Sequence, residues 1–416
     1  MTMPKRWIQL GSAVVAMIMI ANLQYAWTKF VNPMQDTTHW KLSSIQWAFT
    51  LFITFETWIT PVEGWLIDRL GPRIFLSIGG LLVGIGWTSL AFMHSLMQLY
   101  VFYSIAGIGA AFVYSGSVAT ALKWFPDRRG FASGLITAGF GAGAALFIPL
   151  IAHIIQVANY HTAFFYTGIA QGLLILIVAQ VLRNPGPDFK VSKTARAPVS
   201  PKVRRNSAQF NSLQMLLTPH FYLLYTTFLM INVGGLMLTA QAEPVARSFQ
   251  LTVAAVNAAL VTSRLANGAG RIFWGWVSDH IGREMAMFIP YALQALSLLG
   301  VLYLGRLSGT WFTLSMLVLF FIWGSMFSLF PAIIGDYYGA ENATSNYGFL
   351  YTAKGVASIA AGFVAAKVFE KFGSWNYVFY GSAVLALLSA LLILKIRSMP
   401  LPGKMETEGE MVVAEA

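Results

Sequence analysis

Long apolar stretches follow one another along almost the whole chain, and each is about long enough to cross the ~30 Å hydrocarbon core of a bilayer as a helix. Hydrophobic residues make up 57% of the 416 residues and charged residues only 10%, whereas soluble domains have roughly 45–50% and about 25%. Only helices and closed barrels satisfy every backbone hydrogen bond in lipid. The sequence therefore predicts an all-α membrane protein and excludes a water-soluble enzyme.

Charges, glycines, prolines and asparagines divide the apolar sequence into twelve predicted transmembrane helices, arranged as two six-helix bundles around one long polar stretch. The boundaries predict an N-terminal bundle over 1–182, a C-terminal bundle over 219–397 and a cytoplasmic tail over 398–416. The polar stretch 183–218 is rich in proline, lysine and arginine, and we interpret it as a mobile cytoplasmic linker. The predicted spans are 8–30, 44–66, 74–93, 98–122, 131–155, 160–182, 219–243, 252–276, 286–305, 310–334, 347–368 and 375–397.

The net charge of +11 comes from 27 Lys and Arg residues against 16 Asp and Glu residues. A nucleic-acid partner is not indicated, because most of the basic residues lie in short loops between apolar stretches. If the N-terminus is cytoplasmic, only six Lys and Arg residues fall on the opposite side and three lie within spans. The positive-inside rule therefore predicts a multi-pass protein with both termini in the cytoplasm.

Metal, cofactor and catalytic sites are not predicted. The chain has no cysteine, which excludes disulfides, thiolate metal sites and thiol catalysis. Its histidines are scattered near span ends, and no metal-ligand cluster, nucleophile–histidine pair or phosphate-binding loop is found. A sensor that binds a ligand without moving it is a further alternative, but the sequence after Arg397 is short and acidic rather than a signalling domain.

Two loops that lie six spans apart share one pattern. Gly64-Trp-Leu-Ile-Asp68-Arg69-Leu-Gly71 and Gly275-Trp-Val-Ser-Asp279-His280-Ile-Gly282 match with an offset of 211 residues from Gly64 to Gly275. We expect the aspartates to cap neighbouring helices and the basic residues to stay in water. Equivalent loops imply two equivalent bundles, and the pattern resembles the signature of the major facilitator superfamily. The predicted gating residues are Asp68, Arg69, Asp279 and Arg283.

Arg271 and Lys354 lie at similar depth in predicted spans, where a charged residue costs at least ~2.5–3.5 kcal/mol. No acid is near either residue in the sequence. Two cations that face one chamber repel each other, and a carboxylate ligand would relieve this repulsion. Because arginine offers a planar fork and lysine a point charge, the pair predicts a site for a small dianion. The alternative is that Glu56, backbone carbonyls or the membrane interface satisfy both cations.

Three further ionisable residues carry open interpretations. Arg264 lies two helical turns before Arg271 on nearly the same face, with Asn267 between them. It either extends an entry path for anions or forms an ion pair with Glu56. Glu56 is either a proton carrier or a counter-ion, and Glu63 is interpreted as interfacial.

Polar and aromatic residues on other spans predict the rest of a pocket, although helix packing is the alternative for any one of them. Trp323 and Phe327 lie one turn apart and share a helix face. The full set of predicted pocket residues is Gln24, Tyr25, Tyr114, Phe140, Asn267, Arg271, Trp323, Phe327 and Lys354.

Several local sequences together resemble the bacterial oxalate/formate antiporter family, over all twelve spans. The resemblance implies a secondary transporter in the bacterial inner (plasma) membrane that exchanges a small dicarboxylate, oxalate, for formate by alternating access. It implies no cofactor, and by analogy the protein is a monomer. The sequences are Gln24-Tyr25-Ala26-Trp27 with Asn32-Pro33, 123–130, 267–275, Trp323-Gly324 and Asn346-Tyr347-Gly348 with Ala353-Lys354.

Under this resemblance Arg271 and Lys354 are substrate-binding cations, and the implied pocket residues include Gln24, Tyr25, Tyr114 and Trp323. Phe140 and Phe327 stand where the oxalate transporter has tyrosines, and Arg264 and Glu56 stand where it has neutral polar residues.

Proton-coupled monocarboxylate symporters of the lactate/pyruvate type are the alternative family. They share the Asn267 and Arg271 positions, and in such a symporter Glu56 would carry the proton. Lys354 favours the dicarboxylate, because one cation suffices for formate or lactate and two balance oxalate.

Overall fold

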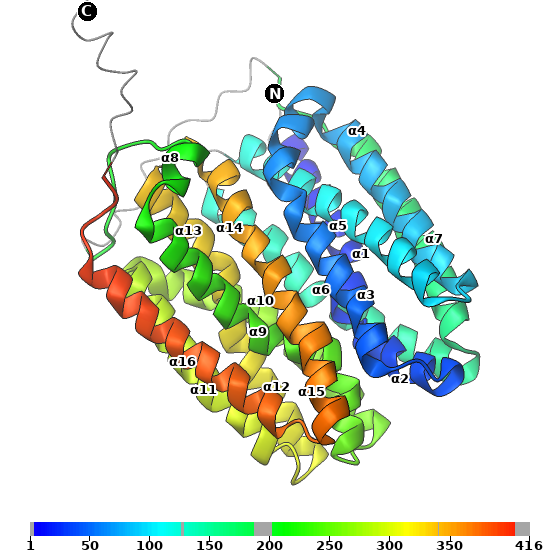
Figure 1. Ribbon diagram of the computed structural model, residues 1–416. Helices are drawn as coiled ribbons and strands as arrows, with labels where there is room; N and C mark the ends of the chain where they lie inside the picture. The colour runs from blue at the N-terminus through cyan, green and yellow to red at the C-terminus, as the bar shows by residue number, and fades with distance from the viewer. Residues whose placement is uncertain (1–3, 126–128, 187–201, 340, 404–416) are drawn as a thin grey trace, which may run out of the picture.

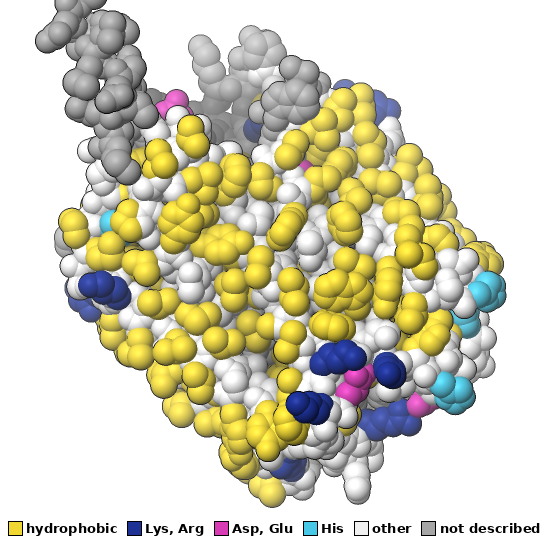
Figure 2. All heavy atoms as spheres, viewed as in Figure 1, with side chains coloured by type: hydrophobic (Ala, Val, Ile, Leu, Met, Phe, Trp, Pro, Cys, Tyr) yellow, Lys and Arg dark blue, Asp and Glu magenta, His cyan; other side chains and the backbone are white. Residues whose placement is uncertain are grey.

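The computed structural model describes residues 4–125, 129–186, 202–339 and 341–403, and every regular element in these ranges is helical. The all-α class is confirmed. Apolar side chains are spread over the whole face in Figure 2, and its charged side chains are few and gather mainly in the lower part of that view. The longer helices are α1 (Pro4–Tyr25), α2 (Thr28–Thr38), α3 (Leu42–Trp58), α4 (Thr60–Ser89), α5 (Leu96–Trp124), α6 (Arg129–Val157), α7 (Tyr160–Val181), α9 (Pro219–Ser248), α10 (Val253–Ile281), α11 (Arg283–Tyr303), α12 (Gly309–Trp323), α13 (Met326–Tyr338), α14 (Ala343–Ser358), α15 (Ala365–Phe372) and α16 (Asn376–Ser398).

Ten helical stretches in the described part of the chain are long and apolar enough to cross a membrane. Ten such stretches indicate a multi-pass membrane protein. Two predicted spans are absent from the ten for physical reasons. Helix α3 has 17 residues, short of the ~20 that a bilayer requires. Helix α10 has 29 residues but contains Arg264, Asn267 and Arg271, which lower its hydropathy.

Helices α1 to α7 lie together on one side of the molecule and α9 to α16 on the other (Figure 1). The two sets meet mainly where α6 packs on α10 and where α14 packs on α3 and α4. Small residues permit the first of these contacts: a Cβ at Gly268 would lie 3.0 Å from the Ala142 side chain. The predicted pocket residues are distributed along this interface.

Three predicted spans are interrupted where we expected continuous helices. Helix α1 ends at Tyr25 before α2, α3 ends at Trp58 before α4, and α12 ends at Trp323 before α13. The connecting residues keep right-handed helical backbone angles, so the chain kinks instead of turning. Kinks of this kind usually have a local cause, and Pro61 in the first turn of α4 is one.

The two repeated loops share a backbone feature. Gly71 has φ 73° and ψ 161°, and Gly282 has φ 94° and ψ 154°. Side chains disfavour this region, so glycine is the residue that suits both positions. Gly71 also divides α4 into two helices, which keeps the second and third predicted spans distinct. The offset of 211 residues, from Gly71 to Gly282, is thus repeated in the backbone as well as in the sequence.

The predicted mobile linker is partly ordered, which corrects our expectation for residues 202–218. The amide of Asn206 donates to the Asp336 carbonyl (2.8 Å), and that of Phe210 donates to the Tyr338 carbonyl (2.9 Å). A capping box of Asn211 and Gln214 then begins the short helix α8 (Ser212–Leu216). Residues 187–201 lie outside the described residues.

The second repeated loop differs from our expectation of a helix cap and solvated basic residues. Asp279 pairs with Arg283 at 2.7 Å, and Arg283 also pairs with Asp336 at 2.7 Å. Arg283 is only 7% exposed, because these carboxylates hold it against α13. The side chains of Asp68 and Arg69, in the first loop, lie outside the described part of the structure.

Candidate functional site

Lys354, on α14, is fully buried, and its ammonium group has three partners. Its Nζ donates to Gln24 Oε1 (2.9 Å) and to the Tyr351 hydroxyl (3.1 Å), and it forms an ion pair with Glu56 Oε2 (2.9 Å). The expectation of a chamber without a resident acid is therefore wrong. From the sequence alone this pair was only the alternative, because Glu56 lies 298 residues earlier, on α3. The pair has no net charge.

Arg271, on α10, contacts both sets of helices. Its Nη1 donates to the Thr137 carbonyl (2.7 Å), and its Nη2 donates to the Tyr25 hydroxyl (3.2 Å) and to Asn267 Oδ1 (3.1 Å). The Phe327 ring lies 4.4 Å from the guanidinium carbon. Among the described residues, no carboxylate pairs with Arg271. Its positive charge is thus uncompensated.

Arg264 lies on the same helix and is also fully buried. Its guanidinium carbon is 4.8 Å from the centre of the Tyr25 ring and 4.1 Å from that of the Phe320 ring. None of its three guanidinium nitrogens has a hydrogen-bond partner among the described residues. The ion pair with Glu56 that the sequence allowed is not formed, because Glu56 pairs with Lys354.

Aromatic rings join the predicted residues into one cluster. Tyr25 lies 5.2 Å from Phe140, and Tyr114 lies 5.4 Å from Phe140 between ring centres. Trp323 and Phe327 meet edge to face at 5.0 Å, as their shared helix face predicts. These contacts, with those of the cations, bring Gln24, Tyr25, Tyr114, Phe140, Asn267, Arg271, Trp323, Phe327 and Lys354 to one region.

Two members of the cluster were missed by the sequence reasoning. Tyr351 binds Lys354 and stacks on Tyr114 at 6.0 Å, and Phe320 covers Arg264. A signal existed for both: Tyr351 lies three residues before Lys354, and Phe320 lies three residues before Trp323. Residues three apart share a helix face.

The polar atoms that lack a partner in this cluster are mostly donors. They are the side-chain nitrogens Gln24 Nε2, Arg264 Nε, Nη1 and Nη2, Arg271 Nε and Trp323 Nε1, against one carboxylate oxygen, Glu56 Oε1. The three cations face one acid, which leaves a surplus of two positive charges. Glu63, a buried acid at the start of α4, is bonded to Ser115 and pairs with none of these cations. The cluster therefore suits a ligand that accepts hydrogen bonds and carries negative charge.

Gly141, on α6, keeps space for the Arg271 side chain. A Cβ at this position would lie 2.8 Å from Asn267 Oδ1 and 3.0 Å from Arg271 Nε. We expect Gly141→Ala to displace both groups and to weaken anion binding about tenfold or more. Gly134→Ala is the matched control on the same helix, because no heavy atom lies within 4 Å of a Cβ there. Isotherms of anion binding to the two purified variants check this prediction, and equal anion affinity in the two variants would contradict it.

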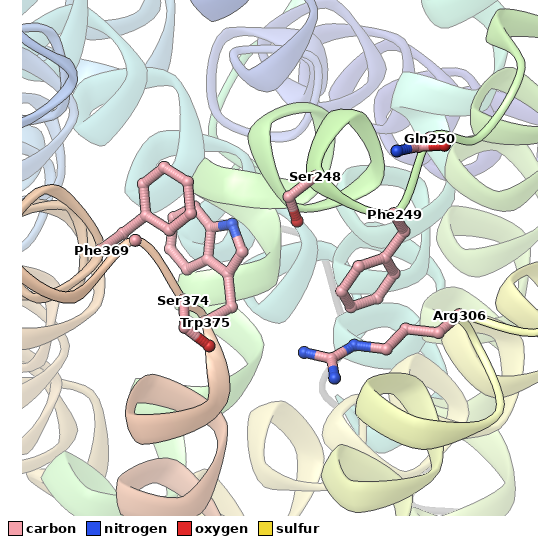
Figure 3. A pocket seen from close by; sticks show the side chains of 8 residues that line it. Ser248, Phe249, Gln250, Arg306, Phe369, Ser374 and Trp375 are labelled. Atoms are coloured by element: carbon pink, nitrogen blue, oxygen red, sulfur yellow. The ribbon is translucent and has the colours of Figure 1, made fainter.

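Two surface pockets lie away from the cluster. One, of about 320 Å³, is lined by Arg306, Trp375 and neighbouring residues, and the Arg306 guanidinium points into it (Figure 3). The other, of about 850 Å³, is lined in part by Asp36, Arg247 and Glu370. Both pockets are open to solvent, so neither provides a dehydrated anion site.

Polar contacts join the two sets of helices at the end of the molecule where α2 meets α9. Lys29 pairs with Glu243 and donates to Asn257 Oδ1 (2.7 Å). Asp36 pairs with Arg247 at 2.8 Å. Glu370 accepts from the Ser43 amide and hydroxyl at 2.7 and 3.0 Å. These three contacts, Lys29–Glu243, Asp36–Arg247 and Ser43–Glu370, hold this end of the interface together.

A multi-pass helical protein with a buried, charged, donor-rich cluster between two sets of helices has the arrangement of a secondary transporter. The chain matches the Major Facilitator Superfamily over residues 12–362 and, in a second match, over 222–412. The protein belongs to this superfamily, and within it to the family of the oxalate/formate antiporters.

Similarity to curated proteins extends over most of the chain. The chain is 37% identical over 400 residues to the oxalate:formate antiporter of Oxalobacter formigenes, and the match covers 96% of this chain and 93% of that protein. Apicoplast pyruvate carrier 1 of Toxoplasma gondii is 23% identical over 416 residues, with 86% and 75% covered. Monocarboxylate transporter 12 of Rattus norvegicus is 23% identical over 379 residues, with 84% and 77% covered. The resemblance predicted from local sequences is confirmed.

Proposed function

We propose that this protein exchanges oxalate for formate across a bacterial plasma membrane. The observation that carries the proposal is the buried cluster, with its unpartnered donors and its surplus of two positive charges. Oxalate is a small acceptor with two negative charges, and formate is a smaller one with a single charge. The 37% identical relative named oxalate:formate antiporter supports the same pair of substrates.

The proposed transporter has twelve transmembrane helices in two six-helix bundles, with both termini in the cytoplasm, and acts as a monomer. The bundles rock about the central cluster so that it opens to one side at a time. The loops with Asp68, Arg69, Asp279 and Arg283 act at the cytoplasmic gate. The residues that line the proposed substrate site are Arg271, Lys354, Gln24, Tyr25, Tyr114, Phe140, Asn267, Trp323 and Phe327.

Obligatory exchange follows from the electrostatics of this cluster. A dehydrated chamber with uncompensated charge is costly to enclose, so the carrier changes conformation readily only when an anion is bound. Opening the end where α2 meets α9 also requires that the pair of Lys29 and Glu243 and the pair of Asp36 and Arg247 separate. Anion binding shifts the population by its differential affinity for the enclosed state.

Proton-coupled uptake of a monocarboxylate is the second candidate, because Glu56 is a buried acid at the cluster and the relatives include a pyruvate carrier and a monocarboxylate transporter. In that mechanism Glu56 binds the transported proton. The Lys354–Glu56 ion pair disfavours this role, since the carboxylate already neutralises a buried cation.

Radiolabelled uptake by proteoliposomes tests the two candidates. Under the exchange proposal, external oxalate enters vesicles loaded with oxalate or formate at least tenfold faster than empty vesicles, and a pH gradient alone gives no uptake. Protein-free liposomes provide the background. Uptake into empty vesicles that follows an imposed pH gradient would instead support the symporter, and no uptake of either substrate would refute both.

A further inference from the structure

Arg264 is the buried cation of this cluster for which the structure shows no function. All of its guanidinium nitrogens lack a partner among the described residues, and the side chain is 0% exposed. A buried guanidinium without a partner is costly, whereas Lys354 makes three contacts and Arg271 makes three. Among these cations, Arg264 is therefore the one with the most unused hydrogen-bonding capacity.

Arg264 also lies against two aromatic rings, those of Tyr25 and Phe320. The Tyr25 ring comes from α1 and the Phe320 ring from α12, so the guanidinium lies between the two sets of helices. Tyr25 contacts both arginines, since its ring faces Arg264 and its hydroxyl accepts from Arg271. Seven residues separate the arginines, which is about two turns and ~10 Å along α10, on one face. Aromatic stacking leaves the edge of a guanidinium free to bind a carboxylate in bidentate fashion.

We propose that Arg264 binds the second carboxylate of the dicarboxylate substrate, while Arg271 binds the first. This inference rests on the proposed exchange of oxalate for formate and specifies which cations hold the dianion. Lys354 and Glu56 then form a neutral pair that positions Gln24 and Tyr351 at the wall of the site. The surplus of two charges belongs to the two arginines of α10, and formate needs only one of them.

Substitution of Arg264 tests the assignment by separating the two substrates. In Arg264→Gln we expect the half-saturating oxalate concentration to rise at least 30-fold, while that of formate in formate self-exchange rises less than threefold. Arg264→Lys, which keeps the charge but loses the planar fork, gives an intermediate value for oxalate. Arg306→Gln is the control, because that arginine is exposed and remote from the cluster.

The outcomes separate this inference from the function on which it rests. Unaltered protein that fails to exchange oxalate for formate refutes the proposed function and the assignment together. Exchange in the unaltered protein with an unchanged oxalate requirement in Arg264→Gln refutes the assignment alone. A parallel loss of oxalate and formate transport also refutes it, since it indicates a structural role. Oxalate titration of detergent-purified Arg264→Gln, followed by tryptophan fluorescence, identifies loss of binding independently of transport, and a thermal unfolding curve verifies that the variant is folded.

Discussion

Arg271→Gln is expected to abolish measurable transport of both oxalate and formate. Arg271 has an uncompensated charge and a free Nε, and it joins α1, α6 and α10 through Tyr25, Thr137 and its own helix. In the proposed complex Arg271 and a substrate carboxylate form a buried, hydrogen-bonded charge pair, and removing one member of such a pair costs about 2–5 kcal/mol. At ~1.4 kcal/mol per factor of ten, this corresponds to a loss of roughly 30-fold to several thousand-fold in affinity.

The conservative variant Arg271→Lys tests the geometry of the Arg271 side chain separately from its charge. Lysine keeps the charge but cannot reach the Thr137 carbonyl, the Tyr25 hydroxyl and Asn267 together with a planar fork. We therefore expect it to lose at least tenfold in oxalate affinity. Exchange assays and oxalate titrations of both variants provide the measurement, with Arg306→Gln as the control. Oxalate exchange by Arg271→Gln at the rate of the unaltered protein would remove the basis of the proposed site.

The second large effect concerns the ion pair of Glu56 and Lys354. Lys354→Gln leaves the Glu56 carboxylate buried without a cation, which costs about 3–5 kcal/mol for a broken buried pair and lowers the charge surplus from two to one. We expect oxalate exchange to fall at least 30-fold in this variant. The double variant Glu56→Gln, Lys354→Gln restores a surplus of two with side chains of similar size, and we expect it to recover most of the lost exchange.

A double-mutant cycle distinguishes compensation from direct contact. Oxalate exchange and thermal unfolding are measured for the unaltered protein, the two single variants and the double variant. Recovery in the double variant indicates that Lys354 acts through Glu56. A double variant as inactive as Lys354→Gln would show instead that the ammonium itself binds substrate, as the family resemblance implies.

The membrane fold could be predicted because length and hydropathy suffice to recognise a spanning helix. The interruptions after Tyr25, Trp58 and Trp323 could not be predicted. Their connecting residues keep helical backbone angles, and two of the three following helices have no proline in their first turn. The order of residues 202–211 was missed for a related reason. That segment is polar, but its amides bond to carbonyls of α13, which local composition cannot reveal.

The cations of the site were recognisable because charge in an apolar stretch is conspicuous. The partner of Glu56 could not be predicted from the sequence, since three cations far away in the chain, Arg264, Arg271 and Lys354, were possible. The choice depends on the packing of α14 against α3, which places Lys354 beside Gln24 and Glu56. The assumption of two unpaired cations at Arg271 and Lys354 was therefore wrong at Lys354, and Arg264 is a buried cation without a carboxylate partner among the described residues.

The backbone angles shared by Gly71 and Gly282 limit how far the two halves of the chain can diverge. Positions exposed on the apolar surface are free to differ between the two halves, because an apolar side chain of another shape still packs against lipid. At these two positions any side chain would strain the backbone by about 1–3 kcal/mol, whatever surrounds it. If the two halves derive from one ancestral sequence, these two glycines would be retained after the sequences of the helices between them have diverged.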